Sequence, residues 1–352
     1  MKRVVALIIS VALCLSLWGC ESLFSQREYS ADFFAMDTYM TITAYGKHAT
    51  EAVDAAVEEI EGLEQLLSTN IPTSEVAMLN KTGSGDVSYA TAVLIQKSLE
   101  YYKETNGVYD ITVYPCVYEW GFTTKNFVVP PEERIEELLP LVGSDKLHCD
   151  SVSNDDDIEK KYHVTFDKEG MMIDLGTIAK GYASQRAAEI LEDYGVQSGI
   201  INLGGNVQLV GTKPDGADWR VAIQKPDKDA EDTAYIGTVS ARNCAITTAG
   251  GYERYFEEDG VIYRHIFDPA TGCPTESSLK SVSVVAKSGI DADGYDTALF
   301  AMDLDEAITF WKEHKDDFDV IIVTEDDKIY VSSGIFDSFE VSDTSYEVVE
   351  IP

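Results

Sequence analysis

The pattern of apolar residues changes part-way along the 352-residue chain, and this change constrains the fold more than any other feature. In the first half, apolar residues recur at helical spacing, which predicts amphipathic helices over residues 48–68, 88–104 and 132–139. In the second half, short runs rich in Val, Ile, Tyr and Phe predict strands. These strands cover residues 163–166, 199–203, 219–223, 235–239, 261–267, 279–286 and 320–323, and further helices cover 177–194, 293–302 and 305–315.

No repeat of fixed period and no clear linker divides these elements. A mixture of helices and strands without a dividing linker is typical of one α+β domain. We therefore predict a single α+β domain of two lobes, with mixed or antiparallel sheets that are flanked by helices.

The charge of the chain restricts its ligands. There are 62 Asp and Glu residues against 27 Lys and Arg, and the formal charge is −35. A field of this sign repels nucleic-acid phosphates, so we expect no nucleic-acid partner. Hydrophobic residues make up 45% of the chain, which is enough for a core and argues against disorder. A phosphate-bearing ligand would need a metal ion, backbone amides or local cations to offset the repulsion.

The N-terminal segment indicates export. Two basic residues precede an apolar stretch, Val4 to Leu17, that is short for a membrane span, and the segment ends at Cys20. This arrangement resembles a bacterial lipobox, in which the Cys is lipidated. We expect an extracytoplasmic lipoprotein anchored to the cell membrane; an ordinary signal peptide or an uncleaved anchor are the alternatives. The predicted segments are a lipoprotein signal peptide at 1–20, a tether at 21–32 and a domain at 33–345.

Four of the six cysteines lie outside the predicted signal peptide, and none forms a CxxC pair that would indicate a zinc or redox site. Outside the cytoplasm they could form disulfides, but small buried residues are an equally good interpretation. They are Cys116, Cys149, Cys244 and Cys273.

Two segments place polar residues at the starts of predicted helices. In the first, Asp174, Thr177 and Lys180 surround a Gly turn that leads into a helix, which suits an anion. In the second, Asp293, with Asp296 and Thr297 three and four positions later, can present oxygens to one side of a helical turn, as Mg²⁺ or Ca²⁺ requires. Simple capping of each helix is the alternative interpretation of both segments.

Two other segments have weaker signals. His265 lies in a predicted strand that runs into an Asp-Pro turn, where it could act as an acid or base or have only a structural role. The turn at 202–206 contains two Gly residues that permit close approach of a flat ligand, although a plain turn would use the same residues.

Seven short motifs, each weak alone, follow one another in a specific order along the chain. They occupy residues 36–38, 107–112, 174–183, 202–206, 249–254, 265–274 and 292–300. In this order they resemble the ApbE family, the FAD:protein FMN transferases, and the resemblance spans residues 33–330. It implies a single ApbE-like domain. It also implies an enzyme that binds FAD and Mg²⁺, splits the pyrophosphate and joins FMN through a phosphoester to a Thr or Ser of an acceptor protein, with release of AMP.

The resemblance also implies roles for individual residues. The Mg²⁺ ligands are expected at Thr177, Asp293, Asp296 and Thr297. The FAD contacts are expected at Met36, Asn70, Val108, Tyr109, Asp110, Asp174, Lys180 and Phe267. His265 and Asp293 are the expected catalytic residues, with His265 near the pyrophosphate.

Two positions depart from the family pattern. Asn70 stands where many members have an aromatic residue, which could shift the balance from transfer toward hydrolysis, and Asp37 stands where Gly is usual. The alternatives to a transferase are therefore an FAD pyrophosphatase that yields FMN and AMP, and a non-catalytic flavin-binding lipoprotein. The expected acceptor is a subunit of a membrane electron-transfer complex.

Overall fold

The computed structural model describes residues 27–152, 161–231, 233–252 and 254–352. The predicted signal peptide at 1–20 and the lipidation residue Cys20 lie outside these residues. Within them, no helix combines the length and the apolar character that are needed to cross a membrane.

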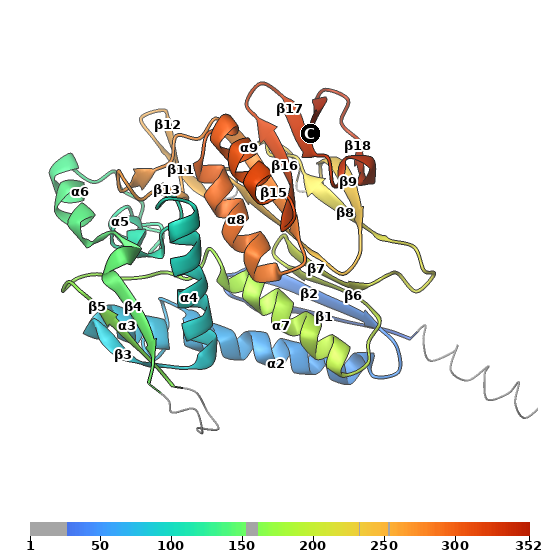
Figure 1. Cartoon of the computed structure of the whole chain (residues 1–352), viewed down its shortest axis with the longest axis horizontal. Helices are drawn as coiled ribbons and strands as arrows, with labels where there is room; N and C mark the ends of the chain where they lie inside the picture. The colour runs from blue at the N-terminus through green and yellow to red at the C-terminus, as the bar shows by residue number, and fades with distance from the viewer. Residues whose placement is uncertain (1–26, 153–160, 232, 253) are drawn as a thin grey trace, which may run out of the picture.

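A nine-stranded sheet forms the centre of the fold (Figure 1). Its order is β1-β2-β6-β7-β10-β15-β16-β17-β19, and every pair is antiparallel except β17 with β19. The strands are β1 (Glu28–Ala35), β2 (Thr38–Tyr45), β6 (Ser198–Leu203), β7 (Asn206–Gly211), β10 (Ala245–Gly250), β15 (Leu279–Ala286), β16 (Phe318–Thr324), β17 (Lys328–Ser332) and β19 (Glu347–Ile351).

The side chains of this sheet alternate between two cores. Val284 of β15 and Ile322 of β16 join the larger core, which the helices cover. Val285 and Ile321 face the opposite way, into a second core beneath a small sheet of order β18-β9-β8. This alternation follows from the two-residue period of a strand. The strands of the small sheet are β8 (Trp219–Gln224), β9 (Tyr235–Ala241) and β18 (Phe339–Val341).

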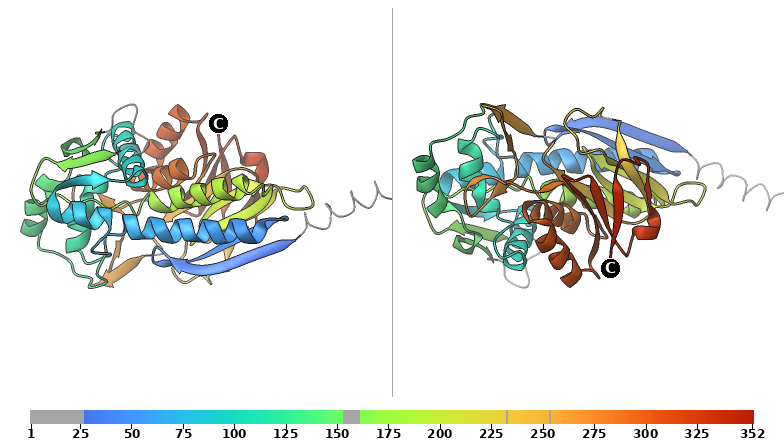
Figure 2. Two further views of the ribbon diagram at one scale, coloured as in Figure 1. Left: turned by 90° about the horizontal axis from the view of Figure 1, so that it is seen from below. Right: turned by 90° about the horizontal axis from the view of Figure 1, so that it is seen from above.

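Helices line the other face of the central sheet. Figure 2 shows α2 and α7 side by side along it. The apolar positions of α2 at Val53, Ile60 and Leu63 are buried, as their helical spacing predicts. The helices are α2 (Ala49–Leu67), α3 (Glu75–Thr82), α4 (Tyr89–Glu104), α5 (Tyr114–Glu119), α6 (Glu132–Leu138), α7 (Ala179–Asp193), α8 (Gly289–Ala301) and α9 (Leu304–Glu313).

A smaller lobe lies at one end of the molecule, where α3 to α6 gather with a three-stranded sheet of order β3-β5-β4 (Figure 1). Trp120 and Phe267 are buried in a third core in this region. The predicted α+β architecture of two lobes is therefore confirmed. The remaining strands are β3 (Ser84–Val87), β4 (Leu147–Ser151), β5 (Tyr162–Phe166), β11 (Tyr255–Glu258), β12 (Val261–Arg264), β13 (Phe267–Asp268) and β14 (Cys273–Pro274).

The domain extends beyond the predicted bounds of 33 and 345. Strand β1 begins at Glu28, inside the predicted tether, because the backbone pairs with β2 along the whole stretch from Glu28 to Ala35. Strand β19 ends at Ile351, because it adds to the free edge of β17. The predicted strand at 261–267 is two strands, β12 and β13, with His265 between them.

Candidate active site

Two tight turns meet at one edge of the central sheet. Strands β2 and β6 pair with Met40 opposite Leu203, so the β1–β2 turn and the β6–β7 turn lie at the same edge. Met36 has φ +49° and Asp37 has φ +61°, as a two-residue hairpin turn of this kind needs. A Cβ on Gly204 would lie 2.2 Å from the Thr38 hydroxyl oxygen, so only Gly allows the two turns to touch.

Helices α7 and α8 cross at two glycines next to these turns. A Cβ on Gly181 would lie 2.1 Å from the carbonyl oxygen of Gly289, and a Cβ on Gly289 would lie 2.4 Å from the carbonyl oxygen of Gly181. The backbones of the two helices are therefore in direct contact, which any larger side chain would prevent. This contact brings the 173–182 segment against the 291–298 segment.

Asp293 connects the two segments directly. Its Oδ2 accepts a hydrogen bond of 2.8 Å from the backbone N–H of Gly181, and its Oδ1 accepts one of 3.1 Å from Nδ2 of Asn206 on β7. Asp293 is 5% exposed and Asp296 is 3% exposed. Ser288, not Asp293, caps α8, since the Ser288 side chain accepts from the N–H of Asp291. The capping alternative therefore fails for Asp293.

The two carboxylates raise one another's cost of ionisation. Burial raises the pKa of Asp293, while the positive charge of Lys180 and the bonds from Gly181 and Asn206 lower it. Burial, and then the charge of Asp293, raise the pKa of Asp296 well above its usual range. Thr297 donates a hydrogen bond of 3.1 Å to Asp296. A pair of buried carboxylates with one nearby cation is a site in which additional positive charge would be stabilised.

Three buried side-chain oxygens on β7 and β10 have no hydrogen-bond partner among the described residues: Asn206 Oδ1, Gln208 Oε1 and Thr247 Oγ1. Thr247 lies on β10 near the Asp296 carboxylate and lowers its pKa, although it is outside hydrogen-bond geometry. Buried oxygens without a partner are rare in folded proteins and usually need an ion, a water or a ligand. Sequence reasoning missed Gln208 and Thr247, because neither residue lies within one of the seven motifs.

Thr177 is held next to the smaller lobe. Its Oγ1 lies 2.9 Å from the hydroxyl of Tyr109, which is buried in the loop that follows α4, next to Val108. No side chain caps α7, so Thr177 is not a capping residue. The charges of Asp293 and Asp174 both raise the pKa of Tyr109, after burial. Tyr109, Thr177 and Asp174 therefore belong to one neighbourhood with Asp293.

Asp110 has a structural role, because its carboxylate accepts hydrogen bonds from two neighbouring residues. Its Oδ1 accepts hydrogen bonds of 2.8 Å and 2.6 Å from the backbone N–H and hydroxyl of Thr112, and one of 2.7 Å from the hydroxyl of Ser144. Its Oδ2 accepts a hydrogen bond of 3.1 Å from the backbone N–H of Ser144. Both oxygens are thus engaged in fixing the loop that leads from α4 to α5, and the predicted FAD contact at Asp110 stays untested.

Arg254 links the turns to His265. Its guanidinium lies 3.7 Å from the carboxylate of Asp37, and its charge lowers the pKa of Asp174, which burial raises. The backbone N–H of Asp174 donates to the carbonyl of Ile111, and its Oδ1 accepts from the N–H of Gly176. Asp37, the departure from the family pattern, therefore places a cation at the edge of the site.

The carbonyl of Arg254 also fixes the His265 ring. The Nδ1 of His265 lies 3.1 Å from that carbonyl, and a carbonyl can only accept, so Nδ1 carries the hydrogen. Burial and the charges of Arg254 and Lys180 lower the pKa of His265 to about 4. His265 is therefore neutral at physiological pH, and the lone pair of its Nε2 is available to accept a proton.

The remaining predicted FAD residues are Met36, Asn70 and Phe267. The N–H of Met36 donates a 2.7 Å hydrogen bond to Glu64 of α2, and Asn70 is exposed in the loop that follows the same helix. Phe267 packs edge-on against Trp120, with ring centroids 6.1 Å apart. These positions border the lobe junction, but their binding role stays a prediction.

Comparison with known proteins identifies the family of the chain. The ApbE family model matches residues 36–322. The FAD:protein FMN transferase of Vibrio cholerae is 31% identical over 93% of this chain and 97% of its own length, and that of Treponema pallidum is 29% identical over 96% of each. The solved ApbE protein of Thermotoga maritima superimposes with a TM-score of 0.74 at 29% identity, covering 91% of this chain and 98% of that one. The flavin transferase ApbE from Vibrio cholerae gives a TM-score of 0.73 at 26% identity over 91% of this chain and 98% of that chain.

Relatives that match nearly the whole chain are named FAD:protein FMN transferase, so the chain is a transferase. The chain belongs to the ApbE family. The predictions of this family and of a transferase are confirmed.

Proposed function

We propose that the protein is a Mg²⁺-dependent FAD:protein FMN transferase. A Thr or Ser hydroxyl of an acceptor protein forms a new P–O bond to the FMN phosphorus of FAD, the P–O bond to AMP breaks, and AMP leaves with the electron pair. The observation that carries the proposal is the hydrogen bond from Gly181 to Asp293, because it joins segments 112 positions apart into one site. The names of the relatives in two other bacteria support the same reaction.

The residues of the site fit a magnesium ion. Asp293 and Asp296 supply two buried carboxylates, and Thr177, Thr297 and Thr247 supply hydroxyl oxygens nearby. Hard oxygen donors of this kind are the ligands that Mg²⁺ prefers. Within the described ranges, no three His, Cys, Asp or Glu side chains group together as a metal site. When bound, the ion would neutralise charge on the pyrophosphate and on the departing AMP.

The other residues would orient and neutralise the substrate. Lys180 lies in the first turn of α7, close enough to Asp293 and Asp296 to lower the pKa of both. The backbone amides of Ala179 and Gly181 in this turn already donate to Leu175 and Asp293, so the Lys180 ammonium is the group that would contact a phosphate. The Nε2 of His265 would accept the proton of the attacking hydroxyl, since its other ring nitrogen donates to Arg254.

The place of this reaction in the cell is also part of the proposal. The lipobox-like segment ending in Cys20 supports an enzyme held by lipid at the outer face of the cell membrane. An acceptor in a membrane electron-transfer complex would then be within reach. Palmitate labelling of the wild-type chain and of Cys20→Ser tests the anchor, and equal labelling of both would refute it.

One incubation tests the reaction. The protein is mixed with FAD, Mg²⁺ and an acceptor domain, and the acceptor is examined for covalent flavin fluorescence after denaturation. We expect fluorescent acceptor and one AMP per flavin transferred, with no product when EDTA is added. Free FMN and AMP without labelled acceptor would instead indicate a pyrophosphatase, and unchanged FAD would indicate a binding protein.

A further inference from the structure

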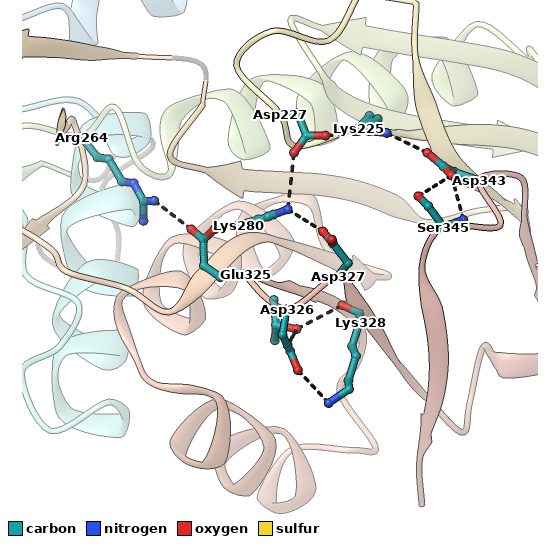
Figure 3. A network of polar contacts seen from close by, with 11 residues as sticks. Lys225, Asp227, Arg264, Lys280, Glu325, Asp326, Asp327, Lys328, Asp343 and Ser345 are labelled. Carbon is teal, nitrogen blue, oxygen red and sulfur yellow. Dashed lines mark hydrogen bonds and ion pairs between the residues drawn. The ribbon is translucent and has the colours of Figure 1, made fainter. Parts of the chain in front are cut away.

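A cavity of about 600 Å³ lies outside the site described above. It opens between the loop that follows β8, the turn after β10, strand β12 and the start of β15. None of the residues predicted to hold FAD or the metal lines it, so it is a separate feature of the molecule. Its polar wall is drawn in Figure 3.

The charge of this cavity differs from that of the chain. Four cations line it against three carboxylates, whereas the whole chain has 27 cations against 62 acidic residues. With Asp327 and Asp343, which pair with two of these cations, the carboxylates number five, so the region is close to neutral and repels an acidic polypeptide less than most of the protein does. The cations are Lys225, Lys228, Arg264 and Lys280, and the three lining carboxylates are Asp227, Asp229 and Glu325.

Three of the cations are held rigidly in place. Lys280 lies 2.7 Å from Asp327 and 3.5 Å from Asp227, and Arg264 lies 3.1 Å from Glu325 (Figure 3). Lys225 is held in the same way by Asp343, at 2.8 Å. The fourth, Lys228, is exposed, and among the described residues no carboxylate lies within ion-pair distance of it. Lys228 is thus free to bind an incoming carboxylate.

The cavity adjoins the proposed base. Arg264 lines it, and the next residue, His265, faces Lys180 and Arg254 in the active site. Ile262, which is 41% exposed, also lines the cavity, and its neighbour Val261 is 50% exposed. A polypeptide in the cavity would therefore rest on apolar side chains of β12 only a few residues from His265.

We propose that this cavity, defined by Lys225, Lys228, Arg264 and Lys280, receives an acidic segment of the acceptor polypeptide. The inference rests on the proposed function, since a protein substrate must approach His265 with its hydroxyl. The acidic segment lies against Lys228 and β12, and this contact directs the adjoining Thr or Ser toward the FMN phosphorus. Complementary charge of this kind chiefly speeds association and sets register.

The test compares Lys228→Glu with a matched control, Lys287→Glu. Both lysines are exposed, and both variants change the charge equally. Lys287 follows the far end of β15, about 23 Å from Lys280 at the rise of an extended strand. The probe is a Thr-bearing acceptor domain that the wild-type protein flavinylates, together with a version whose Asp and Glu residues near that Thr are replaced by Asn and Gln.

For Lys228→Glu we expect the KM for the acceptor to rise roughly tenfold, with the KM for FAD unchanged and Lys287→Glu like wild type. With the neutralised acceptor, wild type and Lys228→Glu should have the same KM. An acceptor KM for Lys228→Glu that stays within twofold of wild type overturns the inference, while transfer itself would still support the proposed function. A wild-type protein that flavinylates no acceptor refutes both.

Discussion

The contact between α7 and α8 can be tested with a single substitution, because the contact requires that residue 181 has no side chain. In Gly181→Ala, the added Cβ would lie 2.1 Å from the carbonyl oxygen of Gly289 and 2.5 Å from the Cβ of Asp293. Real Cβ atoms essentially never approach closer than 3.0 Å. The two helices must therefore separate by about 1 Å, since the nearest obstacle is backbone and cannot rotate away.

This separation has two measurable costs. Overpacking costs up to about 3 kcal/mol, and the better helix propensity of Ala returns about 1 kcal/mol, so the variant should lose roughly 2 kcal/mol of unfolding free energy. The hydrogen bond from Gly181 to Asp293 would also lengthen from 2.8 Å. A displacement of about 1 Å at a reacting centre costs on the order of 100-fold in rate.

The assay pairs thermal unfolding with FMN transfer, and Gly62→Ala is the control. Gly62 lies in α2, and a Cβ there would meet nothing within 4 Å, so this variant should be more stable by about 0.5–1 kcal/mol and fully active. Gly181→Ala should unfold roughly 4 °C lower and transfer flavin about 100-fold more slowly. Wild-type stability and rate in Gly181→Ala would refute the close contact of the helices.

Three other predictions follow from the charges of the site. Asp296→Asn removes one of two buried carboxylates, so in EDTA it should raise the melting temperature by about 2–4 °C and abolish stabilisation by Mg²⁺; a lower melting temperature in EDTA would contradict the repulsion. His265, with a pKa lowered to about 4, binds its proton more readily when unfolded, so its contribution to the unfolding free energy is present above pH 6.5 and is lost as the pH falls toward 4. His265→Gln should therefore lose less stability between those pH values than wild type, while transferring flavin at least about 100-fold more slowly; identical acid sensitivity would argue against the lowered pKa. Asp110→Asn should lower the unfolding free energy by about 2–3 kcal/mol, because the carboxylate accepts four hydrogen bonds, and an unchanged denaturation midpoint would exclude that role.

The long amphipathic helices could be predicted from the sequence, and the buried centre could not. The predicted helix at 48–68 is α2 (Ala49–Leu67), because its apolar residues form one buried face. Strand β10 (Ala245–Gly250) was not predicted, since a short run of small residues in the middle of the sheet is buried on both faces and has no alternation. The start of helix α8 was also predicted too late. The helix begins at Gly289, four residues before the predicted start.

The residues of the site could likewise be predicted only in part. The contacts of Gly181 and Tyr109 bring Asp293, Lys180 and Thr177 into one region, and the predicted roles of these residues as ligands stay predictions. Thr247 was not predicted, and neither was the role of Arg254. Thr247 reaches the carboxylate pair only because β7 pairs with β10 and carries it under α8, and that pairing is set by tertiary packing.

The cysteines of the described residues are all free. Burial, and to a lesser extent the neighbouring Cys273 thiol, raise the pKa of Cys116 to about 11. The interpretation of Cys116 and Cys244 as small buried residues therefore holds, whereas Cys149 and Cys273 are partly exposed. The spacing of the cysteines in the sequence could not distinguish the buried thiols from the partly exposed ones.

The most direct measurement is a crystal of the protein soaked with Mn²⁺ and FAD, examined by anomalous scattering. A single strong peak enclosed by oxygens of Asp293, Asp296 and the threonines beside them, with the FAD phosphates adjacent, is the predicted result. A cation bound only at surface carboxylates, with nothing between the start of α7 and the second turn of α8, would contradict the account.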